Sequence, residues 1–91
     1  MLTVYSKNYC SYCTQAKNYL TKNNIAFQEK NIENDKQARE FILAQGHRTL
    51  PQIYFYGSLF VDGGWQGLSK MSTQEIIQRI EQRTQFINGN L

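Results

Sequence analysis

The two cysteines of this 91-residue chain, Cys10 and Cys13, are spaced C-x-x-C, and this pair constrains the fold more than any other feature. They follow a short apolar and β-branched run at residues 2–5 and lie at the start of a helical pattern. This order predicts a strand, a loop and then a helix whose first turn holds both thiols. Cys10 would be exposed, and Cys13 would lie one turn deeper.

Two thiols in this position can close into a disulfide and reopen. A helix N-terminus carries roughly half a positive charge and unpaired backbone N–H groups, which favour a thiolate over a thiol. Cysteines so placed have pKa values lowered from about 8.5 into the range of roughly 3.5–7.5. We therefore predict that Cys10 is a redox nucleophile and that Cys13 is its resolving partner.

Composition excludes several classes of protein. The length suits one domain, and 41% hydrophobic with 13% aromatic residues predicts a folded core. The net charge of +3 comes from scattered lysines and arginines, which favours a solvated surface over nucleic-acid binding. No signal-peptide pattern opens the chain, and no apolar run approaches the roughly 18 residues of a membrane span. We expect a cytoplasmic monomer. In the cytoplasm a lone cysteine pair is more often catalytic or metal-binding than structural.

Periodicity and turn residues predict the order β-α-β-α-β-β-α. The first three elements imply a parallel strand pair with a right-handed crossover, and the last two strands a hairpin. The fold class is therefore α/β, one four-stranded mixed sheet flanked by three helices. The expected strands are residues 2–6, 25–32, 52–56 and 59–61, and the expected helices run from 11 to about 23, from an N-cap at Asn34 to about 45, and onward from a capping box at 72–75.

Apolar positions predict which helix faces are buried. The second helix would bury Ala38, Phe41 and Ile42, with Gly46 ending it. The last helix would bury Ile76, Ile77 and Ile80.

Four motifs in order resemble the glutaredoxin family: Tyr5-Ser6-Lys7 ending a strand, Cys10-Ser11-Tyr12-Cys13, Thr49-Leu50-Pro51-Gln52, and Gly63-Gly64. The resemblance covers residues 1–83 and leaves 84–91 as a C-terminal tail, expected to be flexible. It implies a thioredoxin-like fold. It also implies an enzyme that reduces protein disulfides and glutathione mixed disulfides, with glutathione as co-substrate.

The same resemblance implies a glutathione site. In such folds Pro51 is preceded by a cis peptide bond, and the backbone of Leu50 recognises the cysteinyl part of glutathione by strand addition. Lys7 would stabilise the thiolate and attract a carboxylate. Gly63 and Gly64 would let the backbone approach an anion. The implied glutathione-binding residues are Lys7, Tyr12, Thr49, Leu50, Pro51, Gly63, Gly64 and Gln66.

Two departures from the family pattern keep alternatives open. Ser11 stands where dithiol glutaredoxins usually have proline, and some members without it bridge an iron–sulfur cluster between two subunits. Gln66 and Gly67 stand where the family often has acids that meet the amine of glutathione. The second departure favours an alternative family member, whose motif residues 46–51 also resemble. This is a glutaredoxin-like redoxin that serves ribonucleotide reductase and is recharged by thioredoxin reductase.

The remaining candidates have less specific roles. His47, the single histidine, could tune the site or lie on a loop surface. Trp65 and Phe60 could form a partner-docking patch or simply pack. Structural zinc needs four ligands, and two cysteines with one histidine are too few, so no metal is expected.

Overall fold

Strand β1 (Leu2–Ser6) is buried along its whole length and lies at the centre of a four-stranded sheet. The computed structural model describes residues 1–87. In it β1 pairs in parallel with β2 (Phe27–Asn31) and antiparallel with β3 (Gln52–Phe55). The short strand β4 (Ser58–Leu59) completes the order β2-β1-β3-β4. The predicted mixed sheet, with its parallel pair and its hairpin, is confirmed.

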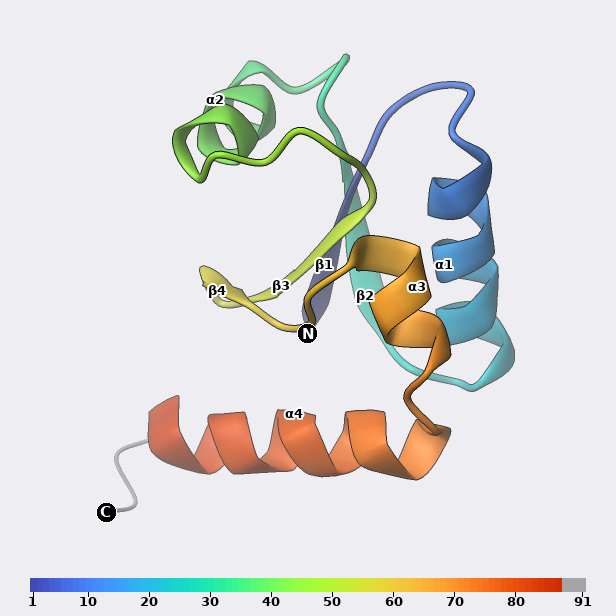
Figure 1. The fold of residues 1–91 in the computed structure, drawn as a ribbon. Helices are drawn as coiled ribbons and strands as arrows, with labels where there is room; N and C mark the ends of the chain where they lie inside the picture. Colours follow the sequence, from blue (N-terminus) through green and yellow to red (C-terminus); the bar gives the residue numbers. More distant parts are fainter. Residues whose placement is uncertain (88–91) are drawn as a thin grey trace.

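Helices cover both faces of this sheet (Figure 1). Helix α1 (Ser11–Lys22) connects the parallel strands, and α3 (Gly64–Ser69) packs beside it. Helix α2 (Lys36–Ala44) lies on the opposite face, and the long α4 (Thr73–Ile87) runs across one end of the molecule.

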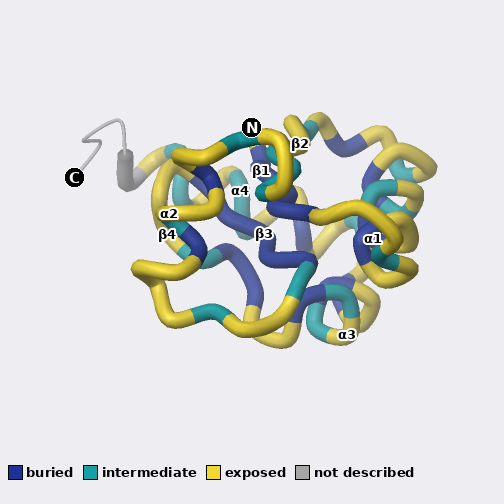
Figure 2. The backbone as a smooth tube through the Cα atoms, turned by 90° about the horizontal axis from the view of Figure 1, so that it is seen from above, coloured by how far each residue is buried: buried dark blue, intermediate teal, exposed yellow. Residues whose placement is uncertain are grey.

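Alternate residues of a strand point to opposite faces of the sheet, so the buried side chains form two apolar clusters, one on each face. These clusters hold the helices against the sheet. The larger cluster joins Leu2, Val4 and Ile53 to buried residues of α1, α3 and α4. The smaller one joins Tyr5 and Tyr54 to α2. Figure 2 shows the central strands as mostly buried backbone surrounded by exposed loops. The loops at the ends of the sheet therefore extend from a buried base.

Helix α2 begins one residue later than predicted. The carboxylate of Asp35 accepts a hydrogen bond from the Ala38 backbone N–H at 3.0 Å, so Asp35 is the N-cap. The prediction of Asn34 was wrong, because its N–H donates to the Asn31 carbonyl in the preceding turn. The predicted burial of Ala38 is confirmed, as is the end of the helix at Gly46, whose φ of +80° suits glycine.

The second half of the chain differs more. The sequence predicts three helices, but α3 is a fourth, formed where only a glycine turn was expected. The hairpin strand was predicted at residues 59–61 and is observed at 58–59. Phe60 leaves the strand and is 1% exposed in the larger cluster, although its N–H still donates to the Ile53 carbonyl at 2.9 Å.

Helix α4 starts with the predicted capping box. The Ser72 N–H donates to the Glu75 carboxylate, and the Glu75 N–H donates to the Ser72 hydroxyl. Ile76 is buried as predicted, but Ile77 is 44% exposed, because consecutive helical residues point in different directions. The helix continues past the expected boundary at residue 83 through Ile87, and the rest of the expected tail lies outside the described residues.

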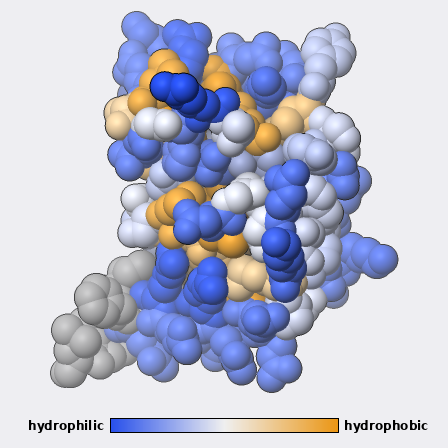
Figure 3. Space-filling model, in the orientation of Figure 1, coloured by the Kyte–Doolittle hydropathy of each residue, from blue (hydrophilic) through white to orange (hydrophobic). Residues whose placement is uncertain are grey.

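Most of the surface seen in Figure 3 is hydrophilic, and apolar side chains reach it in two small areas, near α2 and near the β3–β4 hairpin. Within residues 1–87, no helix is both long enough and apolar enough to cross a membrane.

Candidate active site

Cys10 and Cys13 are joined by a disulfide at the N-terminus of α1, with their Cα atoms 5.2 Å apart. Cys10 is the N-cap residue, and its sulfur accepts a hydrogen bond from the Cys13 backbone N–H at 3.3 Å. Cys13 is 1% exposed, whereas Cys10 is partly open to solvent. In the reduced protein the same N–H and the helix dipole would stabilise a Cys10 thiolate. The geometry therefore suits an accessible nucleophile and a shielded resolving thiol.

The loop before β3 lies against this cysteine. The Leu50–Pro51 peptide bond is cis, as the family resemblance implied, and the Leu50 carbonyl oxygen lies 3.7 Å from the Cys10 sulfur. Buried Gln52 holds the loop, since its amide donates to the Thr49 carbonyl at 3.0 Å and to the Thr49 hydroxyl at 3.3 Å. Gln52 is thus a positioning residue that the sequence analysis did not identify.

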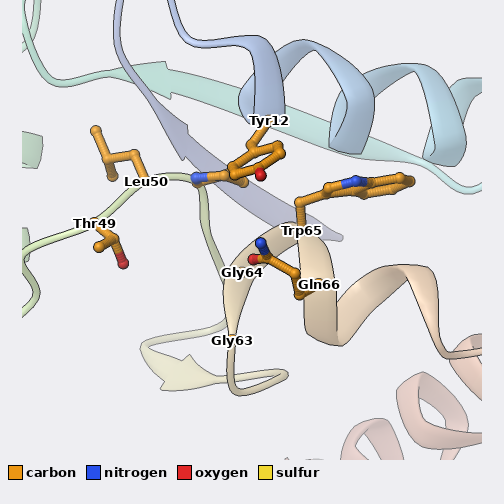
Figure 4. Close-up of a pocket in the computed structure, with 8 residues that line it drawn as sticks. Tyr12, Thr49, Leu50, Gly63, Gly64, Trp65 and Gln66 are labelled. Atoms are coloured by element: carbon orange, nitrogen blue, oxygen red, sulfur yellow. The ribbon is translucent and has the colours of Figure 1, made fainter.

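A groove of about 330 Å³ opens beside the loop, with α1 on one side and the start of α3 on another (Figure 4). It brings together every residue expected to bind glutathione except Lys7, together with Trp65. Its lining residues are Tyr12, Thr49, Leu50, Pro51, Gly63, Gly64, Trp65 and Gln66.

The two glycines line one side of the groove with their backbone. Gly63 and Gly64 have φ values of +84° and +55°, which glycine adopts without steric cost. A Cβ atom on Gly64 would lie 2.6 Å from the Pro51 carbonyl oxygen. Only glycine therefore lets α3 begin so close to the cis-proline loop.

Gly67 explains one departure from the family pattern. A Cβ atom at this position would lie 1.7 Å from the Asp62 carbonyl oxygen, so the backbone leaves no space for any side chain. Position 66 is different, because Gln66 is exposed and its amide extends into the space below Tyr12 (Figure 4). An acid could be accommodated at 66 but not at 67.

Lys7, His47 and Phe60 do not line the groove. Lys7 is exposed and does not line the groove. His47 hydrogen-bonds the Tyr54 hydroxyl in the smaller cluster and is also absent from the lining. Phe60 is too deeply buried for a docking patch, so that alternative was wrong for this residue.

Trp65 both packs and lines the groove. It packs against the larger cluster and meets Tyr19 edge to face at 5.6 Å. The sequence signal for Trp65 was its position directly after the glycine pair.

No group of three or more His, Cys, Asp or Glu residues that could hold a metal ion occurs within the described part of the chain.

Comparisons with known proteins identify the family. The family model described as Glutaredoxin matches residues 2–60. The glutaredoxin-like protein NrdH of Lactococcus lactis is 42% identical over 53 residues, spanning 58% of this chain and 74% of that protein. Glutaredoxin 3 of Escherichia coli is 38% identical over 52 residues, spanning 56% of this chain and 63% of that protein.

Among solved structures, a buckwheat glutaredoxin–glutathione complex superposes with a TM-score of 0.69 at 21% identity, covering 89% of this chain and 76% of that one. At this identity the likeness concerns the fold. A mutant of the thioredoxin-like protein BC3987 is 27% identical and superposes with a TM-score of 0.59, covering 65% of this chain and 81% of that one, so the fold is thioredoxin-like. With a family model that matches well over half of its length and a C-x-x-C pair at the start of α1, this chain belongs to the glutaredoxin family, whose members are thiol–disulfide oxidoreductases.

Proposed function

We propose that the chain uses glutathione to reduce protein disulfides and glutathione mixed disulfides, and that it works as a cytoplasmic monomer. The observation that carries this proposal is the groove beside Cys10, whose Leu50 carbonyl lies 3.7 Å from the nucleophilic sulfur. An extended cysteinyl backbone in the groove could pair with Leu50 and bring its own sulfur to Cys10. The buckwheat relative, which was crystallised with glutathione, supports this choice of ligand.

The reaction follows from the positions of the two sulfurs. The Cys10 thiolate attacks a substrate disulfide, forms a mixed disulfide and releases one substrate thiolate. For a protein disulfide, the Cys13 sulfur then attacks Cys10, releases the second substrate thiol and leaves the Cys10–Cys13 bond. Two glutathione molecules restore the dithiol and leave as glutathione disulfide. For a glutathionylated protein, Cys10 and one further glutathione suffice.

A second candidate is a redoxin that serves ribonucleotide reductase and is recharged by thioredoxin reductase. Two observations favour it. The NrdH relative is described as glutaredoxin-like, and neither position 66 nor position 67 carries the acid that would meet the amine of glutathione. Because Gly67 has no space for a side chain, that charge could be supplied only at position 66.

Two parallel assays separate these candidates. One supplies NADPH, glutathione and glutathione reductase, and the other supplies NADPH and thioredoxin reductase. We expect turnover mainly in the glutathione assay. Turnover in the thioredoxin reductase assay, with none in the glutathione assay, would favour the redoxin.

In the glutathione assay, Cys10→Ser should abolish both protein-disulfide reduction and deglutathionylation. Cys13→Ser should keep deglutathionylation but lose protein-disulfide reduction. Equal loss of both activities in Cys13→Ser would contradict the division of roles between the two cysteines.

A further inference from the structure

Tyr9 directly precedes the nucleophile and is fully exposed, with a relative accessibility of 105%. Its φ is +54°, in the left-handed region that bulky side chains rarely adopt. The exposed ring gains no packing that would offset this conformation. Strained residues of this kind cluster at functional sites, where the surrounding structure holds them in place.

Asn31, at the end of β2, and Glu33, just after it, hold the residue before Tyr9 in place. The backbone N–H of Asn8 donates to the Glu33 carboxylate at 2.8 Å, and the Asn8 side-chain amide reaches the same carboxylate at 3.4 Å. The Asn31 amide donates to the Asn8 side-chain oxygen at 2.9 Å. These contacts fix the loop from the end of β2, and the Tyr9 side chain, one residue before Cys10 in the chain, stays exposed to solvent.

The location of Tyr9 indicates which reaction partner it meets. It is absent from the lining of the groove, which lies against Leu50 and which the proposed function assigns to glutathione. An exposed ring beside the nucleophile can cover apolar surface on the other partner, the protein whose disulfide is attacked. Aromatic pairs add specific stabilisation beyond the area that they bury.

We propose that Tyr9 is a recognition residue for protein disulfides, selecting substrates with an aromatic side chain next to the attacked cysteine. The inference rests on the protein-disulfide part of the proposed function. It does not depend on the identity of the reductant.

The test uses the full chain, reduced beforehand and freed of reductant, in single turnover. Two disulfide-linked peptides differ only in having Phe or Gly beside the cysteine. Each turnover oxidises Cys10 and Cys13 to their disulfide and reduces the peptide disulfide to two thiols, which receive the two protons. We expect the wild-type protein to react faster with the Phe peptide, and Tyr9→Ala to lower this preference by about threefold to tenfold. Rates with the Gly peptide and with hydroxyethyl disulfide should not change.

Tyr56 offers a matched control. It is 70% exposed with a φ of +49°, but it follows Phe55, which pairs with Leu2 at the start of β1, whereas Tyr9 and Cys10 follow the other end of that strand. Tyr56→Ala should keep the full preference for Phe. Tyr9→Gly should lose it while retaining the melting temperature or raising it, because glycine tolerates positive φ.

The possible failures are distinct. If the wild-type protein reduces both peptides at equal rates, or if Tyr9→Gly keeps the preference, the role of Tyr9 is overturned and the dithiol chemistry stands. If the wild-type protein reduces neither peptide, protein-disulfide reduction itself fails, and the role of Tyr9 fails with it.

Discussion

The groove beside Cys10 has two walls that are built differently. The Thr49–Pro51 loop is held by side-chain hydrogen bonds, which buried Gln52 donates to Thr49. The Gly63–Gln66 turn is held by backbone packed on backbone, and neither Gly64 nor the adjoining Gly67 has space for a Cβ atom. The first wall therefore depends on the identity of one supporting side chain, and the second depends on the absence of side chains.

This difference determines where specificity can change. At Gly64 and Gly67, any larger residue displaces the wall itself. At Gln66, the side chain is exposed and reaches the groove, so its charge can change while the backbone stays in place. The structure therefore separates positions that form the groove from a position that tunes its ligand.

The largest effect is expected for Gly67→Ala. Its Cβ atom would lie 1.7 Å from the Asp62 carbonyl oxygen, so the turn must move, and we expect the free energy of unfolding to fall by about 3 kcal/mol. Urea unfolding measures this value.

Gly57→Ala is the control, since its φ is +81° but no atom lies within 4 Å of the added carbon. This control should cost only about 1 kcal/mol. Equal losses in the two variants would show that backbone contact does not hold the second wall.

The parts of the structure that follow local sequence patterns could be predicted from the sequence. The cysteine helix and the strands around it were identifiable because apolar periodicity and the C-x-x-C motif coincide at residues 2–20. The cis bond before Pro51 was identifiable only through family resemblance, because nothing in the residue itself specifies it.

Helix α3 was missed for a physical reason. Gly64 and Gly67 have poor helix propensity, and the pair Gly63-Gly64 is typical of a turn. Close packing against Pro51 and Asp62 overrides that local preference, and such contacts are visible only in three dimensions. The role of Gln52 was hidden similarly, because a glutamine at the start of a strand is usually solvated rather than 6% exposed.

An intermediate effect is expected for Gln66→Glu. It restores a negative charge where the groove can accommodate one, so we expect the KM for glutathione to fall by about threefold to tenfold. Because the side chain is exposed, stability should stay within about 0.5 kcal/mol of the wild type.

Steady-state assays at several glutathione concentrations measure the effect of Gln66→Glu, with Gln74→Glu on the exposed side of α4 as a charge control. If Gln66→Glu leaves the KM unchanged, the amine of glutathione does not meet this side chain, and the redoxin alternative gains support.

The smallest effect tests whether the groove depends on an ion pair outside it, between Lys17 of α1 and Glu29 of β2. The Glu29 carboxylate accepts hydrogen bonds from Lys17 at 2.8 Å and from the buried Ser6 hydroxyl at 2.6 Å, which lower its pKa below the ordinary value. A lowered carboxyl pKa in the folded protein stabilises the fold above the unfolded pKa of about 4.3 and loses this contribution as the pH falls through the folded value.

Glu29→Gln removes the charge but keeps an oxygen that can accept from Ser6. We expect it to reduce the free energy of unfolding by less than about 1 kcal/mol at pH 7, since the ion pair is partly exposed. The difference from the wild type should shrink as the pH falls below the unfolded pKa of about 4.3, and it should disappear once the pH is below the lowered pKa of Glu29 in the folded protein. Urea unfolding at a series of pH values measures this dependence. Glutathione turnover at pH 7 should not change, because Glu29 is absent from the groove lining. A loss of turnover would mean that the end of β1 transmits this contact to Cys10, and that the walls depend on more than their own contacts.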